Sequence, residues 1–401
     1  MLRRQMLLGG LGGLVATVGT TTGAQAKGVA LTEPAGWPQR GGPMSVREFG
    51  ARGTGLVDDS PAFDAALAFM ARSGGSLYIP AGQYRIDRPL QSINLLNQAA
   101  GVRFFGDGPA SEIRPNRLRD RLFRFDNVHE RVSFEDVAFV GNGVGAEADC
   151  AAIAYAAYCS AGIEFTRCAF AGLRSDSTDY RGLIDTYAAD IEVHKCYFGG
   201  SAHSSGAMIH ASEFGAIAVT HSTFIDYMTT GSVAHTKTSA CASASWIWIS
   251  TPNAGASQTA AEQSSIVVRQ CLFDEGALRG IDLDPEGGAR IERALVEDCN
   301  FNVNGVTWAA GLRARNVDRL AVRRARFSGL GSRQRDAVQL EAVDVADLEH
   351  VVAVAGAPRL RADAATQYWS LRDCAIPVIA SQAARARIED KGVVTTFPVP
   401  V

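Results

Sequence analysis

Five side chains in the central part of this chain have the types that acid–base chemistry needs. One is an imidazole, three are carboxylates and one is a guanidinium. Removal of a proton next to a carboxylate needs a base and a cation that stabilises the developing carbanion. Hydrolysis of a glycosidic bond needs instead two carboxylates that flank the bond. The candidate catalytic residues for these two reactions are His210, Asp185, Asp282, Asp284 and Arg313.

The two reactions would use these residues differently. In a lyase, His210 or Tyr187 would take the proton, and an arginine would neutralise the carboxylate of the substrate. In a glycosidase, Asp282 and Asp284 would act from one face of a strand, together with Asp185. Aromatic faces and further charges nearby suit the binding of acidic sugar rings. The candidate substrate-binding residues are Tyr187, Trp246, Trp248, Arg279, Arg315 and Glu341.

These candidates lie in short segments in which apolar and polar residues alternate. The segments are GLIDTY from Gly182, AMIHAS from Ala207, SWIWIS from Ser245, GIDLD from Gly280, GLRARN from Gly311 and AVQLEA from Ala337. Alternation is typical of β-strands, whose successive side chains point to opposite faces. If the central aliphatic residue of each segment points inward, one residue per segment points outward, and together these residues form a stripe. A shift of one residue in the strand register would invert the faces of the first three segments. The predicted stripe is Asp185, His210, Trp246 or Trp248, Asp282, Arg313 and Gln339.

A second motif, repeated along the chain, predicts how the segments are arranged. It reads apolar, any, apolar, two mostly polar, small, any, Phe. Its copies are VSFEDVAF from Val132, IEFTRCAF from Ile163, IEVHKCYF from Ile191, IAVTHSTF from Ile217, IVVRQCLF from Ile266 and LAVRRARF from Leu320. Successive copies that begin at 163, 191 and 217 lie 28 and 26 residues apart. Such a period is typical of a solenoid, in which each repeat buries its apolar face against its neighbours. With about three strands per repeat, we expect an all-β chain folded as a single parallel β-helix.

The cysteines favour the same fold. Cys168, Cys196, Cys271 and Cys299 occupy the small position of the motif, and Cys374 fits it in WSLRDCAI. Equivalent positions of stacked coils lie about 4.8 Å apart and point the same way, so we expect an interior row of reduced thiols. A disulfide framework is the alternative, and a bridge between residues 150 and 159, which lie off the row, stays open.

Residues 45–90 contain a series of local motifs that identify a family. They are Phe49-Gly50-Ala51, the pair Asp58-Asp59, an amphipathic helical pattern after Pro61, and Tyr78-Ile79-Pro80-Ala81-Gly82-Gln83-Tyr84. This series resembles the opening of the pectate-lyase-like (pectin lyase-like) right-handed parallel β-helix superfamily. The resemblance implies an N-terminal cap at 45–90, with a helix over the first coil and structural roles for the Asp pair. Coils at 91–380 and a C-terminal tail or cap at 381–401 would follow.

The same superfamily contains lyases, epimerases, polygalacturonases and phage tailspikes, so the resemblance implies a substrate class rather than one reaction. Gly280 to Asp284 resembles a polygalacturonase strand, but Arg279 stands where an Asp is expected. Asp284-Pro285-Glu286 partly matches an alginate-epimerase motif that lacks its His here. We expect a lyase that cleaves a uronic-acid-containing polysaccharide by β-elimination. The alternatives are a glycoside hydrolase, an epimerase, and a non-catalytic polysaccharide-binding or assembly factor.

Charge and the N-terminus limit the partners and the location. The chain has 39 basic and 42 acidic residues, which does not suit a nucleic-acid binder. Residues 1–26 have the pattern of an export signal, with Arg3-Arg4 similar to a twin-arginine motif, and the apolar run is too short for a membrane span. Residues 27–44 read as a tether. We expect a periplasmic or secreted protein that requires no cofactor; outward carboxylates could bind Ca²⁺. The oligomeric state stays open.

Overall fold

The structure is a computed structural model. It describes residues 43–95, 101–141, 148–203, 206–213, 215–225, 245–250, 265–274, 279–285, 289–302, 310–329, 336–354, 358–380 and 388–390. The predicted export signal, most of the tether and most of the C-terminal segment lie outside these ranges, as do Tyr227, His235, Lys237, Cys241 and Trp308. Within the described part, no helix is long and apolar enough to cross a membrane.

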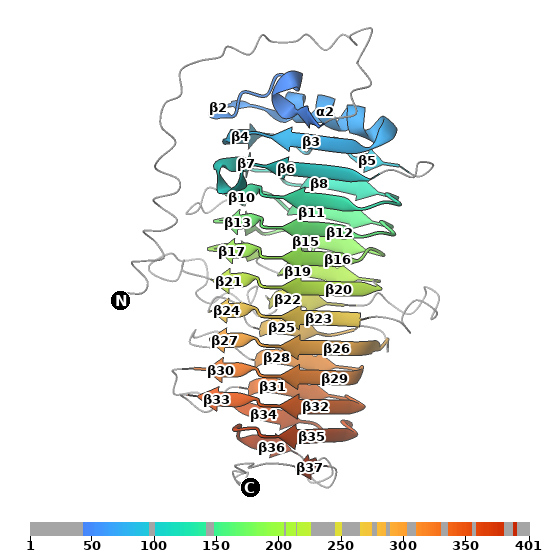
Figure 1. Cartoon of the computed structure of the whole chain (residues 1–401), viewed down its shortest axis with the longest axis vertical. Coiled ribbons are helices and arrows are strands. Elements are labelled where there is room, and N and C mark those ends of the chain that lie inside the picture. The colour runs from blue at the N-terminus through green and yellow to red at the C-terminus, as the bar shows by residue number, and fades with distance from the viewer. Residues whose placement is uncertain are drawn as a thin grey trace, which may run out of the picture.

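The described chain forms a right-handed parallel β-helix, as predicted. Its coils stack along the long axis of Figure 1, from the N-terminal cap to the C-terminal end. Three parallel sheets, which we call A, B and C, run the length of the stack, and each coil adds one strand to each sheet. Because every strand pairs with the equivalent strand one coil away, the repeat in the sequence becomes a set of straight rows of side chains in space.

Sheet A contains the first half of the repeated motif. Its strands are β1 (Met44–Ser45), β3 (Gly75–Ile79), β6 (Val102–Gly106), β9 (Val132–Glu135), β12 (Ile163–Thr166), β16 (Ile191–His194), β20 (Ala216–Thr220), β23 (Ser265–Arg269), β26 (Ile291–Glu297), β29 (Val317–Arg323), β32 (Val345–Glu349), β35 (Tyr368–Arg372) and β37 (Ile388–Asp390).

Sheet B contains the end of the motif with its Phe. Its strands are β2 (Thr54–Asp58), β4 (Gly82–Ile86), β7 (Ser111–Pro115), β10 (Ala138–Val140), β13 (Ala169–Ala171), β17 (Tyr197–Gly199), β21 (Thr223–Ile225), β24 (Leu272–Asp274), β27 (Asn300–Asn302), β30 (Arg326–Ser328) and β33 (Val352–Val354).

Sheet C contains the segments with the candidate site residues. Its strands are β5 (Ile93–Asn94), β8 (Arg121–Asp126), β11 (Ala152–Ala157), β15 (Gly182–Tyr187), β19 (Ala207–Ser212), β22 (Ser245–Ile249), β25 (Arg279–Leu283), β28 (Ala310–Arg315), β31 (Asp336–Glu341), β34 (Arg359–Ala362) and β36 (Val378–Ala380). A small extra sheet pairs β14 (Arg174–Ser175) with β18 (Ala202–His203).

The corner between sheets A and B depends on one residue per coil. Arg167, Lys195, His221 and Gln270 all have φ near +53°, in the left-handed region that turns the chain sharply. The conformation costs a non-glycine residue about 1–2 kcal/mol, which the packing of the coils on either side offsets. The second polar position of the repeated motif is therefore the corner itself.

Rows of identical side chains fill the interior. The Phe that closes the motif stacks on its equivalent in the next coil, with ring centroids 4.5 Å apart for Phe170–Phe198 and 4.6 Å for Phe198–Phe224. The row continues through Phe273, Phe301 and Phe327. Burial of each such ring contributes about 1.5–3 kcal/mol, so the stack is held by contacts that recur in every coil.

The row of reduced thiols is also present. Seven described cysteines are free and buried, including Cys150 and Cys159, so the open bridge between these two does not form in this structure. In the row, the Cys168 thiol donates to the Phe134 carbonyl at 3.4 Å, in the preceding coil. Burial raises the pKa of Cys159 to about 11. The buried thiols thus serve as small apolar residues with one weak donor each.

The cap at the N-terminal end has the predicted helix. A 3₁₀ turn, η1 (Val46–Phe49), precedes helix α2 (Ser60–Ser73), and Phe63 and Met70 on the buried face of α2 are fully buried. The helix covers the first coil in Figure 1 and so protects its open edge. Its N-cap is Asp59. Asp59 accepts from the backbone N–H groups of Arg52 and Gly53, which is a structural role. A second 3₁₀ turn, η2 (Gly108–Ala110), lies between β6 and β7.

Candidate functional site

The predicted stripe on sheet C is present, and it is a straight row. Strand pairing places Asp185 opposite His210, His210 opposite Trp248, Trp248 opposite Asp282, Asp282 opposite Arg313, and Arg313 opposite Gln339. The row also extends past the predicted residues, to Tyr155 and Arg124 on the N-terminal side. The spacing of about 4.8 Å between strands puts each side chain in reach of its neighbours.

The start of each sheet C strand departs from strict alternation, and this corrects one prediction. Trp246 is 2% exposed, and its ring lies 5.7 Å from Phe224 in the interior row. Ile247, the next residue, is fully buried as well. Because two consecutive side chains point inward, Trp246 belongs to the core and cannot bind substrate. Trp248 is the tryptophan on the outer face.

At the centre of the row, an aspartate, a histidine and a serine form a hydrogen-bonded chain. Asp185 Oδ1 lies 2.7 Å from His210 Nδ1, and His210 Nε2 lies 2.8 Å from Ser250 Oγ. Asp185 Oδ2 accepts from the backbone N–H of Arg181 at 2.7 Å. A carboxylate can only accept, so Nδ1 carries the ring proton and Nε2 of the neutral imidazole presents its lone pair to the Ser250 hydroxyl. His210 is therefore oriented as a base.

An aromatic ring and an exposed cation adjoin this base. The Trp248 ring centroid lies 5.0 Å from that of His210, and the Arg181 guanidinium carbon lies 5.3 Å from the Trp248 ring. Arg181 is exposed, whereas Trp248 is partly buried. The indole Nε1 of Trp248 is buried and has no hydrogen-bond partner in the described structure. Trp248 thus contacts both the buried imidazole of His210 and the exposed guanidinium of Arg181.

The next two rungs of the row hold a different kind of cluster. Arg313 Nε donates to Asp282 Oδ1 at 2.6 Å, and Arg313 Nη2 contacts both Asp282 and Asp284. Arg279 donates to Asp282 Oδ2 at 3.0 Å. Arg315 pairs with Asp284 at 3.0 Å and with Glu341 at 2.7 Å. Three arginines and three carboxylates therefore neutralise one another.

Burial shapes the protonation of this cluster. Asp282 is 2% exposed, and burial raises its pKa above the ordinary value, against the opposing effect of Arg279 and Arg313. Burial lowers the pKa of Arg313, but Asp282 and Asp284 raise it by more, so the guanidinium stays charged. The cluster is a buried, charge-balanced support, in which Nε and Nη2 of Arg313 are already bonded to Asp282 and Asp284.

Tyr187, the other predicted base, lies two residues beyond Asp185 on the same face. Its ring contacts Tyr158 at 5.2 Å. Hydrogen bonds to Glu213 and Tyr158 raise the pKa of Tyr187 above its usual range. The phenol therefore stays protonated at neutral pH, which suits an acid and not a base.

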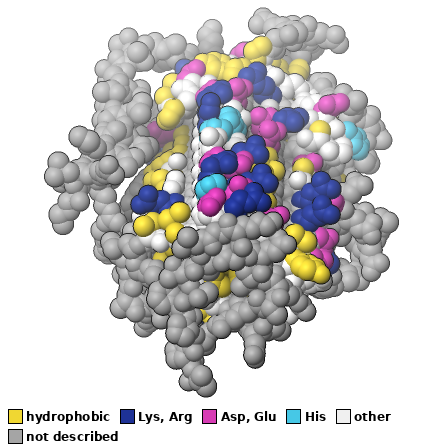
Figure 2. Space-filling view, turned by 60° about the horizontal axis from the view of Figure 1, so that its bottom comes forward, with side chains coloured by type: hydrophobic (Ala, Val, Ile, Leu, Met, Phe, Trp, Pro, Cys, Tyr) yellow, Lys and Arg dark blue, Asp and Glu magenta, His cyan; other side chains and the backbone are white. Residues whose placement is uncertain are grey.

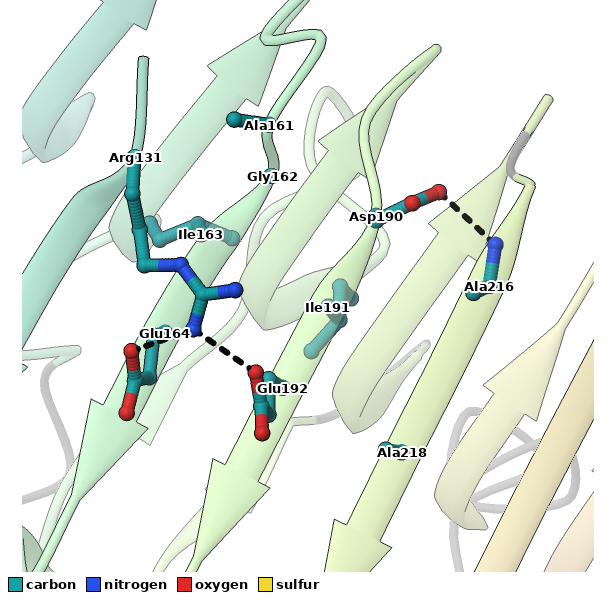
Figure 3. A pocket seen from close by; sticks show the side chains of 10 residues that line it. All are labelled: Arg131, Ala161, Gly162, Ile163, Glu164, Asp190, Ile191, Glu192, Ala216 and Ala218. Atoms are coloured by element: carbon teal, nitrogen blue, oxygen red, sulfur yellow. Dashed lines mark hydrogen bonds and ion pairs between the residues drawn. The ribbon is translucent and has the colours of Figure 1, made fainter. Parts of the chain in front are cut away.

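Sheet A carries a small hollow lined by charged side chains. It has a volume of about 200 Å³ and lies at the start of β12, β16 and β20. Figure 3 shows Arg131 between Glu164 and Glu192, and Asp190 directed at the backbone of Ala216. In the face drawn in Figure 2, basic and acidic side chains interleave along a central band. Its charged side chains are already bonded to other groups of the protein, Arg131 to the two glutamates and Asp190 to the backbone.

Two site residues were not among the predicted candidates. Ser250 is the last residue of the segment SWIWIS, and its position in the sequence does not indicate a contact with His210. The register of β19 against β22 brings the two side chains together. Arg181 immediately precedes the segment Gly182–Tyr187, and its contact with Trp248 depends on the tertiary structure. Among the described residues, no group of three or more His, Cys, Asp or Glu side chains is arranged to hold a metal ion.

Comparison with known proteins places the chain in a family. Residues 44–281, more than half of the chain, match the family model described as rhamnogalacturonase A/epimerase, pectate lyase-like. Mannuronan C5-epimerase AlgE1 of Azotobacter vinelandii is 36% identical over 98 residues, which are 23% of this chain and 6% of the relative. AlgE5 of the same organism is 49% identical over 43 residues, which are 10% of this chain and 4% of the relative. The chain thus spans less than a tenth of the length of these curated relatives.

A solved structure agrees on the fold. PfbA, a surface adhesin of Streptococcus pneumoniae, superposes with a TM-score of 0.53 at 13% sequence identity, covering 85% of this chain and 93% of PfbA. At this identity the likeness concerns the β-helix alone. The match to the family model, together with the stacked coils and the capping helix, shows that this chain belongs to the rhamnogalacturonase A/epimerase family of pectate lyase-like proteins.

Proposed function

We propose that this protein removes the C5 proton from a uronate residue of an acidic polysaccharide and cleaves the chain by β-elimination. The observation that carries the proposal is the position of His210. Asp185 fixes its tautomer, and the exposed Arg181 lies on the neighbouring Trp248 ring. A base beside a cation is what carbanion chemistry next to a carboxylate requires.

Each group at this site then has a role. The indole face of Trp248 binds a sugar ring, and Arg181 pairs with the carboxylate of that sugar. His210 Nε2 takes the C5 proton after the Ser250 hydroxyl has rotated away from it, and Asp185 stabilises the imidazolium that forms. Tyr187, which is protonated, donates a proton to the leaving glycosidic oxygen. Arg181 replaces Arg313 in the role that the sequence suggested.

Epimerisation at C5 is the second candidate. It begins with the same proton removal, but a proton is returned to the opposite face and the chain is not cleaved. The similarity to mannuronan C5-epimerases over up to 98 residues favours it. The site residues would be the same, with Tyr187 as donor to carbon.

Hydrolysis by paired aspartates has less support. Asp282 and Asp284 both contact Nη2 of Arg313, so they lie on either side of a guanidinium and not of a sugar bond. A glycosidase also needs one protonated and one ionised carboxyl with access to substrate. Asp282 is buried and held by two arginines.

The test is incubation with a panel of polyuronates in heavy water. Elimination produces an unsaturated uronide that absorbs in the ultraviolet and shortens the polymer. Epimerisation gives neither signal, but NMR shows deuterium at C5 and a changed ratio of epimers. Shortening without unsaturation would indicate hydrolysis, and retention of polymer with no chemical change would indicate a binding protein; either result would reject the proposal.

Such a substrate lies outside the cytoplasm, which agrees with the export signal expected at residues 1–26. We infer a periplasmic or secreted location reached by the twin-arginine route. Cell fractionation checks this, because replacing Arg3 and Arg4 by Lys should leave the protein in the cytoplasm. Equal amounts of both forms outside the cytoplasm would contradict the route.

A further inference from the structure

The chain Asp185–His210–Ser250 has the geometry of a nucleophilic triad. Its two hydrogen bonds, 2.7 Å and 2.8 Å, are within the range expected between orienting acid, base and nucleophile. Ser250 is 1% exposed and His210 is 3% exposed, so the bonds lie in a place where bulk water competes little. Proton removal from a uronate makes no use of Ser250.

A donor suited to an oxyanion lies in the same place. The buried indole Nε1 of Trp248 has no hydrogen-bond partner in the described structure. Trp248 pairs with His210 across the strands, and Ser250 follows it by two residues on the same face. A buried N–H without a partner costs about 1–3 kcal/mol, and a ligand that supplies an acceptor would remove this cost. The negative oxygen of a tetrahedral intermediate is such an acceptor.

We propose that Ser250 is the nucleophile of a second activity, the hydrolysis of small O-acyl esters carried by the polysaccharide. Burial of Ser250 restricts the acyl group to a small one, of the size of acetyl. The choice of a polysaccharide as the carrier rests on the proposed function, whereas the ester chemistry rests on the triad alone. One histidine would thus serve two reactions on the same polymer.

The reaction balances without any further reagent. Ser250 Oγ bonds to the acyl carbon while its proton passes to His210 Nε2, and Asp185 stabilises the imidazolium. The bond from the acyl carbon to the sugar oxygen then breaks, and that oxygen takes the proton from Nε2. Water attacks the acyl-serine, giving its proton to Nε2, and the acid leaves as Ser250 regains its proton.

Two measurements on the full-length protein test this. p-Nitrophenyl acetate, quenched in acid during turnover, should acetylate the wild-type protein once, and peptide mass spectrometry should find this acetyl adduct on Ser250. The protein should also release nitrophenol from p-nitrophenyl acetate and acetate from an O-acetylated polyuronate. Ser250→Ala should abolish the adduct and lower ester hydrolysis at least 10²-fold, and Trp248→Phe, which removes the N–H but keeps a ring, should lower it about 10²-fold.

The variants separate this proposal from the proposed function. Ser250→Ala should lower ester hydrolysis far more than the reaction on de-acetylated polyuronate, whereas Arg181→Ala should raise KM for that polyuronate about 10-fold and change hydrolysis of the neutral ester p-nitrophenyl acetate much less. The adduct is measured on the wild-type protein, so this test does not depend on whether a variant folds. Absence of an adduct on Ser250, or ester hydrolysis that survives Ser250→Ala, would overturn the triad. Loss of polyuronate chemistry in both variants would instead show that Ser250 serves as a support for His210.

Discussion

Two neighbouring parts of one row on sheet C use polar side chains in opposite ways. In the first part, Asp185, His210 and Ser250 form a chain of hydrogen bonds that leaves an oriented base beside the exposed Arg181. In the second part, Arg313 is held between Asp282 and Asp284, and every charge is matched. The comparison teaches that outward position on a β-helix does not by itself indicate function. What separates the two parts is the kind of cluster: a directional Asp–His–Ser chain in the first, and paired opposite charges in the second.

The largest expected effect comes from breaking the support. Arg313→Met leaves Asp282 buried with one of its two arginines missing, which should lower the free energy of unfolding by about 3–5 kcal/mol. Urea unfolding followed by circular dichroism measures it. The matched control is Arg324→Met, because Arg324 pairs with Glu297 and Asp298 but is half exposed, where such pairs contribute about 0–1 kcal/mol. Equal losses in the two variants would contradict the assignment of the Arg313 cluster as a buried support.

Breaking the site should instead remove activity. His210→Ala should lower kcat on a polyuronate by about 10² or more, as loss of a general base does. The melting temperature should fall as well, because the buried Asp185 loses its imidazole partner, so kcat is compared below the melting temperature of the variant. His194→Ala is the control, because His194 lies on sheet A and bonds to Thr220. If His210→Ala kept near-normal turnover, the base would have to lie elsewhere and the first part of the row would lose its role.

A smaller effect distinguishes the two arginines. Arg181→Ala should raise KM for an acidic polymer about 10-fold, weaken its dependence on salt, and leave stability unchanged. The reason is that Arg181 is exposed and contributes a charge to the substrate, whereas Arg313 is committed to Asp282 and Asp284. Steady-state kinetics at two ionic strengths, with Arg167→Ala as a control on another face, measures it. If Arg313→Met raised KM more than Arg181→Ala did, the arginine that binds the substrate would be Arg313 and not Arg181.

The smallest effect concerns pH. Because burial raises the pKa of Asp282, the folded protein binds more protons than the unfolded chain in the window between the unfolded pKa, about 3.8, and the higher folded pKa. The contribution of Asp282 to stability therefore falls as pH rises through that window. Asp282→Asn should remove this slope from the urea midpoint measured against pH.

Asp298 supplies the opposite case. Arg324 lowers the pKa of Asp298, so its contribution is present above the unfolded pKa and is lost as pH falls through the folded pKa. The difference in urea midpoint between the wild type and Asp298→Asn should therefore change with pH in the opposite direction. If the differences for Asp282→Asn and Asp298→Asn changed with pH in the same direction, burial would not be the dominant effect on the pKa of Asp282.

The sequence alone was enough to predict most of the fold. The repeated motif required a stack, because a coil with one apolar face is stable only against its neighbours, and the rows of Phe and Cys follow from the same period. Alternation also placed Asp185, His210, Asp282 and Arg313 correctly in one outward row. These are local properties, since the period and the parity of a strand are written in consecutive residues.

Only the tertiary structure decided which members of the row cooperate. Trp246 and Trp248 are two residues apart, so strict alternation would place both on the same face of the sheet. Trp246 instead points inward, because the first residues of β22 depart from alternation. Ser250 lies 40 residues from His210, and Arg313 lies 31 residues from Asp282, yet each pair is in hydrogen-bond contact. Such pairs depend on the register between coils and on the loop lengths between them. The sequence by itself therefore determined the scaffold and the outward row of polar side chains, whereas the register between coils decided which side chains of that row bond to one another.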